Sequence, residues 1–179
     1  MLEGRNVNLR VMEKEDWSLY AEWLNNLEFQ GDYFILTQFS RADMEKMAES
    51  NLFESRFFII EKRDGTKIGY ILYFYMLHPW GKMLKIAYAI VPSERGKGYC
   101  TEAAQLMIDY LFLSKDATRI QAVTHVKNVA SQKVLEKVGF RKEGVLRKSL
   151  LIRGEWTDTI FFSILREEWE KPRILTKTT

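Results

Sequence analysis

Apolar residues in the first third of the chain follow two different spacings. Alternation over residues 7–12 (VNLRVM) predicts a strand near the start. Residues 15–26 carry apolar side chains at helical spacing, which predicts a helix whose aromatic residues lie in the core. Ser40, followed three residues later by Asp43, is a typical helix-start signature and predicts a second helix.

The middle of the chain predicts a hairpin and a strand–helix connection. Two apolar runs flank Asp64-Gly65, a dipeptide typical of hairpin turns. A further strand over residues 83–91 leads through a glycine-containing turn into a long helix. We expect the polar residues of that helix to form its solvated face; these are Glu102, Gln105 and Asp109.

The last third completes the order of elements. A strand over residues 119–126 precedes a short helix over residues 128–140, and two closing strands flank residues 152–156. The resulting order is β-α-α-β-β-β-α-β-α-β-β. It predicts an α/β or α+β domain in which helices pack on the faces of a mixed sheet.

Composition limits the class of protein. The chain has 179 residues, 46% of them hydrophobic, which predicts one globular domain over residues 1–170 with a polar tail over residues 171–179. One cysteine and a charged start without an apolar leader favour a reducing, cytoplasmic location. No apolar run approaches the roughly 18 residues that span a bilayer. A net charge of +3 is too small to indicate nucleic-acid binding.

The turn over residues 95–100 (RGKGYC) has the features of an anion-binding loop. Its two glycines allow backbone N–H groups to approach a ligand, and a helix start follows, where anions bind favourably. The spacing fits neither the Walker pattern nor the dinucleotide fingerprint. A plain tight connection after Pro92 explains the glycines equally well at this point.

A second polar signature stands at the start of the short helix. Asn128 is a good N-cap, Ser131 occupies the third helical position, and Gly139 ends the helix. Both polar residues could serve only to cap the helix.

Taken together, these motifs resemble the GNAT superfamily of N-acetyltransferases, which use acetyl-CoA. The pyrophosphate-binding pattern of that family, Gln/Arg-x-x-Gly-x-Gly/Ala, is matched by Arg95, Gly98 and Cys100. The stretches over residues 9–26 and 128–165 are similar to the branch of ribosomal-protein N-terminal acetyltransferases, the RimJ and RimL type. The resemblance covers roughly residues 6–169.

The resemblance implies a mostly antiparallel sheet of six to seven strands, splayed at its middle, with helices on both faces. It also implies acetyl-CoA as co-substrate and a possible homodimer, and we expect no metal, because two histidines and one cysteine offer no metal-ligand cluster. The pantetheine arm would contact the backbone of Ala89, Ile90 and Val91, while Asn128 and Ser131 would line its other side. The pyrophosphate would lie on the turn, formed by Arg95, Gly96, Lys97, Gly98, Tyr99, Cys100 and Thr101.

Acetyl transfer to an amine needs a neutral amine, a polarised carbonyl and a proton donor for the leaving thiolate. Many GNAT enzymes donate that proton from a tyrosine seven residues after the asparagine, where this chain has Leu135. The resembled branch implies Ser131 instead. Lys85 replaces a glutamate that the family often carries, so no base is evident there.

Other residues are candidates for the base or for acceptor contacts. His125 is a possible base or a surface histidine at a strand end, and Asp158 is a possible acceptor contact or a turn partner. Phe29 and Tyr33 belong to a loop that would flank the acceptor. Further carboxylates that could supply a base are Glu28, Asp32 and Glu155.

The acceptor class stays open between a protein N-terminal α-amine and a small-molecule amine. At neutral pH about a tenth of an α-amine is neutral, against under roughly a thousandth of a lysine amine, so a site without a strong base slightly favours α-amines. Leu135 and Lys85 also suit a catalytically inactive CoA-binding or interaction module. Cys100 is interpreted as a small residue in place of Gly or Ala, although a helix start can activate a thiol.

Overall fold

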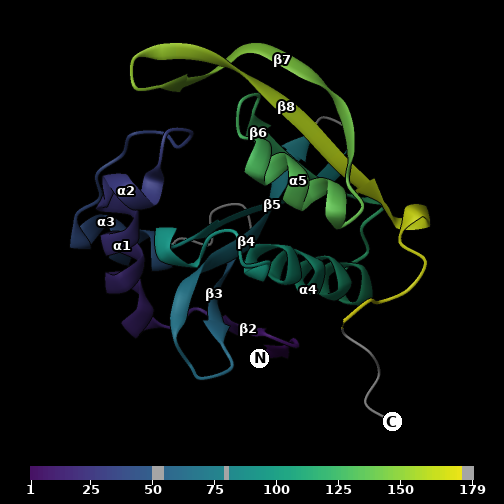
Figure 1. Cartoon of the computed structure of the whole chain (residues 1–179), viewed down its shortest axis with the longest axis horizontal. Coiled ribbons are helices and arrows are strands. Elements are labelled where there is room, and N and C mark those ends of the chain that lie inside the picture. The colour runs from purple at the N-terminus through teal and green to yellow at the C-terminus, as the bar shows by residue number, and fades with distance from the viewer. Residues whose placement is uncertain (50–54, 79–80, 175–179) are drawn as a thin grey trace.

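The computed structural model describes residues 1–49, 55–78 and 81–174 (Figure 1). One sheet of eight strands runs through the molecule in the order β1-β2-β3-β4-β5-β6-β8-β7. The strands are β1 Leu2–Glu3, β2 Val7–Val11, β3 Arg56–Lys62, β4 Lys67–His78, β5 Gly81–Ile90, β6 Arg119–His125, β7 Arg141–Ile152 and β8 Glu155–Leu165.

Helices cover both faces of this sheet. Those of the first face are α1 Trp17–Asn25, α2 Leu27–Gln30 and α3 Arg41–Glu49, and those of the second are α4 Tyr99–Ser114 and α5 Val129–Lys137 (Figure 1). Short 3₁₀ turns are η1 Lys14–Asp16, η3 Pro92–Glu94 and η4 Arg166–Glu168. None of the helices in the described ranges combines the length and hydropathy that a membrane crossing needs.

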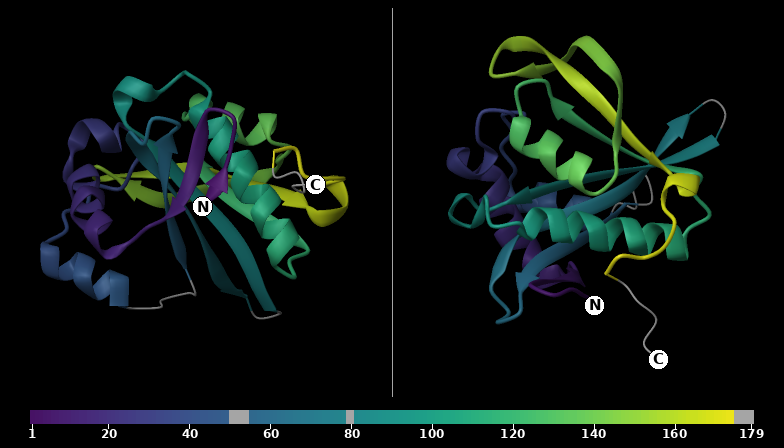
Figure 2. Two further views of the ribbon diagram at one scale, coloured as in Figure 1. Left: turned by 90° about the horizontal axis from the view of Figure 1, so that it is seen from below. Right: turned by 45° about the vertical axis from the view of Figure 1, so that its right-hand side comes forward.

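The expected mixed, mostly antiparallel sheet with helices on both faces is confirmed, but the expected strand count of six to seven is wrong. The eighth strand is β1, which pairs Leu2 with Leu9 and Glu3 with Asn8. A two-residue strand has no periodicity of its own, so no hydrophobic pattern could reveal it. At the other end, β7 and β8 form a long hairpin that arches past α5 (Figures 1 and 2).

Alternation along the strands divides the core in two. In β3, Phe58 and Ile60 pack in the core that α4 and α5 cover, while Ile59 packs in the core of α1 and α3. Tyr20 and Trp23 of α1 belong to the same core as Ile59, as their helical spacing predicted. Each face of the sheet therefore has its own apolar layer.

The sheet divides at its centre. In the described strands, β5 and β6 are parallel and pair only at Leu84–Ile120 and Lys85–Gln121, whereas β4 pairs with the whole length of β5. Beyond Lys85 the two strands separate, as the resemblance implied. We call the gap between β5 and β6 beyond this pair the fork.

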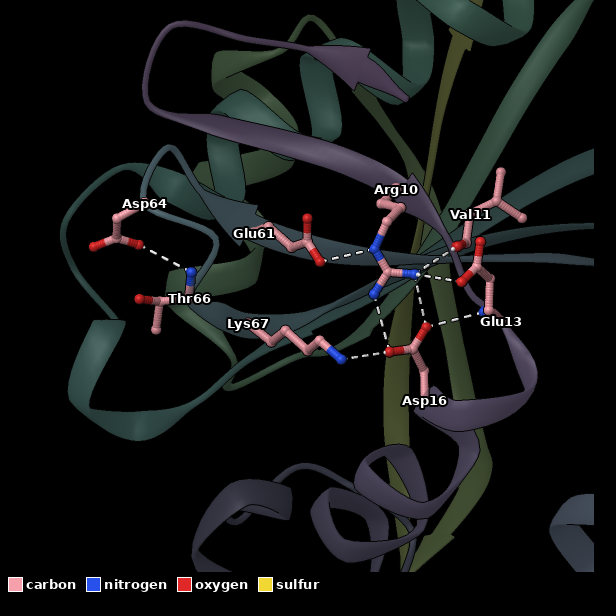
Figure 3. A network of polar contacts seen from close by, with 8 residues as sticks. All are labelled: Arg10, Val11, Glu13, Asp16, Glu61, Asp64, Thr66 and Lys67. Carbon is pink, nitrogen blue, oxygen red and sulfur yellow. Dashed lines mark hydrogen bonds and ion pairs between the residues drawn. The ribbon is translucent and has the colours of Figure 1, made fainter.

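A polar network joins β2 and the start of α1 to the hairpin of β3 and β4 (Figure 3). Asp16 is 2% exposed and accepts two hydrogen bonds from Arg10, at 2.8 and 2.9 Å, and one from Lys67 at 2.7 Å. Arg10 also donates to Glu61 at 2.8 Å. Burial alone raises the pKa of Asp16, but these hydrogen bonds, with one from the Glu13 N–H, outweigh it and hold the pKa well below its ordinary value.

Two of the three polar residues of the long helix α4 that were expected in solvent, Gln105 and Asp109, are buried instead, while Glu102 is partly exposed. Asp109 is fully buried and accepts hydrogen bonds from Trp169 Nε1 and from the backbone N–H groups of Arg173 and Ile174. Gln105 is also buried and donates to Asp109. Part of the segment expected as a polar tail therefore packs against the domain, while residues 175–179 lie outside the described ranges.

Candidate active site

The turn before α4 has the backbone of an anion-binding loop. Gly96 and Gly98 have φ angles of +77° and +86°, and a Cβ at either position would meet open space. The first bond of the helix runs from the Glu102 N–H to the Gly98 carbonyl. The N–H groups that precede Glu102 therefore have no i−4 partner, and they lie at the positive end of the helix dipole.

The two cations of the turn have partners within the chain. Arg95 Nε donates to the Ile90 carbonyl at 3.0 Å, and its guanidinium also donates to the Phe29 carbonyl at 2.6 Å, which ties the turn to β5 and α2. Lys97 Nζ donates to Glu94 at 2.9 Å, and this bond lowers the pKa of the Glu94 carboxyl. An anion at the turn would rely chiefly on backbone N–H groups.

The main chain of β5 offers further groups beside the fork. The Val91 N–H donates to the Ile68 carbonyl of the neighbouring segment, at 2.9 Å. Since lateral direction alternates along a strand, Ala89 also faces β4, whereas the N–H and C=O groups of Tyr88 and Ile90 face the fork. The backbone contacts that we expected at Ala89, Ile90 and Val91 thus fit Tyr88 and Ile90 better.

Tyr88 is a site residue that the sequence analysis missed. Its hydroxyl lies 3.1 Å from Ser131 Oγ at the start of α5, across the fork. Burial raises the pKa of Tyr88, so the phenol is neutral. The Asn128 side chain accepts the Ser131 N–H at 3.1 Å and caps α5 as expected, which fixes Ser131 relative to β6. Only the pairing of two distant segments brings Tyr88 and Ser131 together.

Cys100 lies in the first turn of α4 and packs against the core. Burial raises the pKa of its thiol to about 12, so the thiol stays protonated at neutral pH. This favours the interpretation of a small residue in place of Gly or Ala over that of a nucleophile.

Comparison with protein families identifies the domain. Residues 6–141 match the family model described as an acetyltransferase (GNAT) domain, which is most of the chain. The chain belongs to the GNAT acetyltransferases. The probable N-acetyltransferase YjcK of Bacillus subtilis is 31% identical to this GNAT domain, over 96% of this chain and 100% of YjcK.

Solved structures share the fold of this GNAT acetyltransferase. Spermidine N-acetyltransferase from Vibrio cholerae, in complex with CoA and spermine, superposes with a TM-score of 0.81 at 21% identity, over 92% of this chain and 98% of that one. RimJ from Mycobacterium smegmatis, in complex with CoA-disulfide, has a TM-score of 0.78 at 25% identity, over 93% and 85% of the two chains. The likeness to RimJ agrees with the branch that the motifs indicated.

Two of the predicted site residues of this GNAT domain come together at the end of β6. The His125 ring stacks on Tyr33, with centroids 4.9 Å apart. His125 is 8% exposed, so it is not the surface histidine that was the alternative. Its Nδ1 accepts the Lys127 N–H at 2.9 Å, so a neutral ring carries its hydrogen on Nε2. That nitrogen can donate but cannot accept a proton, which argues against His125 as the base.

The candidates Asp158 and Phe29 have structural partners. Asp158 accepts the Lys148 N–H at 2.8 Å, where β7 departs from its register and Lys148 has a φ of +48°. The carboxylate therefore stabilises this irregular stretch of β7. Phe29 does not fit an acceptor contact, because its ring is 4% exposed and stacks on Trp23 in the core.

No phenol replaces the family tyrosine on α5. Leu135 is 1% exposed and packs in the core with α4, so the position expected for that tyrosine is part of the apolar layer. In this GNAT domain, hydroxyl groups reach the fork from Ser131 and Tyr88 instead. Within the described residues, no three His, Cys, Asp or Glu side chains gather as metal ligands do.

Proposed function

We propose that this GNAT acetyltransferase transfers an acetyl group from acetyl-CoA to a primary amine, by direct attack of the amine in a ternary complex. The observation that carries the proposal is the fork. The β5–β6 pairing stops at Lys85 and Gln121, next to a helix start with free N–H groups. One extended ligand with a phosphate at one end and a thioester at the other matches both features.

The residues of the chain suit acetyl-CoA as co-substrate. The pyrophosphate would bind the backbone N–H groups from Gly96 to Thr101, at the start of α4. The amides of the pantetheine arm would pair with the fork-facing N–H and C=O groups of Tyr88 and with the Ile90 N–H, much as a further strand would, while the Ile90 carbonyl already accepts from Arg95. Asn128 and Ser131 would line the opposite wall.

The proton donor for the leaving thiolate is Ser131 in this proposal. The amine nitrogen attacks the thioester carbon, the carbon–sulfur bond breaks, and the sulfur takes up the Ser131 proton, while the proton that the amine loses returns to the Ser131 oxygen through water. The Tyr88 hydroxyl lies 3.1 Å from Ser131 Oγ and 3.4 Å from the Ser131 carbonyl, to which it can also donate. When Tyr88 donates to Oγ, the hydrogen of Ser131 is free to point at the sulfur. Tyr88 is thus a positioning residue that orients the hydroxyl of Ser131.

The acceptor in this proposal is a small-molecule amine or a protein N-terminal α-amine. Neither His125 nor Asp158 is free to act as a strong base, since each holds a backbone N–H. An α-amine needs less help with deprotonation, because its pKa is about 7.7–8.0. A cytoplasmic location and a homodimer belong to the same proposal, and fractionation and light scattering test them.

The alternative is a CoA-binding module without turnover. The buried Leu135 favours it, since the family phenol is missing from α5. CoA release decides between the two, because a binding module takes up acetyl-CoA but never forms product.

The test combines calorimetry with a turnover assay. We expect saturable acetyl-CoA binding, and CoA release with at least one member of a panel of amino acids, N-terminal peptides, polyamines and aminoglycosides. Absence of acetyl-CoA binding would refute the whole proposal. Binding without CoA release from any acceptor would leave only the binding module.

A further inference from the structure

The face of the sheet opposite α4 and α5 is open beside the fork. Ile86 packs in the core under α4, so Lys85 and Ala87 point to the other face. Ala87 is exposed although β5 is a central strand of the sheet. The helices of that face pack instead around Ile59 and Tyr70, on β3 and β4. The uncovered area around Ala87 lies next to the place where the thioester would enter the fork.

Lys85 supplies a positive charge to this open area. Its Nζ lies 5.8 Å from the ring centroid of Phe74 and 5.9 Å from that of Phe161. No carboxylate pairs with Lys85 in the described part of the chain. The Glu143 carboxylate accepts hydrogen bonds from Ser163, whose side chain is on the same face, and from Arg119. Burial lowers the pKa of Lys85, as it does for an ammonium that lacks a counter-ion.

The other charges near this area lie on its rim. Side chains alternate along β6, so His125 points to the same face as Gln121, which pairs with Lys85. The His125 ring stacks on Tyr33. Two exposed acids lie nearby along the chain, Glu28 in α2 and Asp32 next to Tyr33. The hairpin adds a second cation there, because Arg153 donates to the Gly31 carbonyl of this loop at 3.0 Å.

We propose that Lys85 binds a carboxylate of the acceptor, so that this enzyme acetylates amino acids in preference to polyamines. The inference rests on the proposed acetyl transfer and specifies its substrate class. A half-buried ammonium without a partner gains a charge-assisted hydrogen bond when a carboxylate arrives. A polyamine would instead bring further positive charge next to Lys85, which is repulsive in this partly dry site.

Two aromatic rings beside Lys85 give the site an apolar contact surface. Phe74 and Phe161 flank Lys85, and both rings are partly exposed. An amino acid with an apolar side chain could place its carboxylate on the ammonium and its side chain against these rings. Phenylalanine is therefore a suitable first acceptor, and phenethylamine is the same molecule without the carboxylate.

The experiment measures CoA release with phenylalanine, phenethylamine and spermidine. We expect the wild-type enzyme to prefer phenylalanine in kcat/KM. Lys85→Met should lower kcat/KM for phenylalanine about ten- to a hundredfold, the range of a hydrogen bond to a charged group, and should change that for phenethylamine far less. Lys85→Glu should reverse the preference and favour spermidine.

Lys115→Met is the matched control, because Lys115 Nζ also lies 5.8 Å from a ring centroid, that of Tyr73, away from the fork. It should leave the preference unchanged. An equal loss with phenylalanine and phenethylamine in Lys85→Met would overturn the inference and indicate a base or a structural role. Wild-type preference for spermidine would also overturn it, with acetyl transfer intact. CoA release from none of the acceptors would overturn acetyl transfer itself.

Discussion

At the scale of single residues, hydrogen-bond partners decide what each candidate side chain can do. Arg95 has two carbonyl partners, so it holds the turn in place more than it offers charge to a ligand. His125 accepts a backbone N–H at the nitrogen that a base would need. Ser131 differs, because its partner Tyr88 can donate and so leaves the serine hydrogen available.

The Tyr88–Ser131 contact can be tested by removing one hydroxyl. We expect Tyr88→Phe to lower kcat about five- to tenfold, the loss of a hydrogen bond of about 1 kcal/mol, because the Ser131 hydroxyl loses its orientation. The KM for acetyl-CoA should change little, since the phenol does not contact the phosphates. Steady-state kinetics separates the two quantities.

A control shows whether the loss is specific. Tyr110→Phe removes a phenol from a ring that packs on Phe58 and Tyr73, away from Ser131, and should keep wild-type kcat. Ser131→Ala should cost more than Tyr88→Phe. Unchanged kcat in Tyr88→Phe would mean that Ser131 acts without it.

At the scale of elements, the glycine turn combines two requirements at one position. Gly98 needs a left-handed backbone, which other residues adopt at a cost, and it also lies where a phosphate would approach. Gly65 in the β3–β4 turn has almost the same φ, +83°, and equally open space around a Cβ, but no ligand site. A comparison of substitutions at Gly98 and Gly65 therefore distinguishes the effect of backbone strain from the effect of lost ligand contact.

Gly98→Ala and Gly65→Ala should therefore destabilise the fold by a similar amount, about 1–2 kcal/mol, in urea denaturation. Only Gly98→Ala should also weaken CoA binding by calorimetry, since the new methyl group stands between the helix start and the phosphates. Equal CoA affinities in the two variants would contradict the proposed phosphate site.

Local signals predicted these elements well, and contacts between distant segments explain what they missed. The capping pairs Ser40–Asp43 and Asn128–Ser131, and the turn at Asp64-Gly65, form as the sequence predicted, because each needs only neighbours in the chain. The burial of Asp109 depends on Trp169 and residues 173–174, and that of His125 on Tyr33. Helical spacing contains no information about either partner.

At the scale of the whole molecule, the network around Asp16 links segments that are far apart in the sequence. It joins β2, the start of α1 and the β3–β4 hairpin through Arg10 and Lys67. The pKa of Asp16 is lower in the folded than in the unfolded chain, so its ionised form favours folding. This contribution is complete above the unfolded pKa of about 3.9 and is lost as the pH falls towards the folded value.

Asp16→Asn should lower the free energy of unfolding by about 3 kcal/mol at pH 7, because Arg10 and Lys67 lose their common partner. Urea denaturation at pH 7, 5, 4 and 3 should show the gap to wild type narrowing below about pH 4. Glu13→Gln is the control, since Glu13 is exposed and its carboxylate lies 3.9 Å from Arg10; it should shift stability by well under 1 kcal/mol. A gap that is constant with pH would contradict the ionised role of Asp16.

The fork also divides the sheet into two units. Strands β1 to β5 form one antiparallel unit and β6 to β8 another, and two residue pairs of the described strands join them. Side-chain contacts such as Tyr88–Ser131 and Tyr33–His125 add to this connection. Each unit can open locally at a lower free energy than the whole chain. A molecule that bonds to β5 on one side and α5 on the other spans both units. Its binding free energy is lost when either unit opens, so the two units of the liganded protein unfold more cooperatively than those of the free protein.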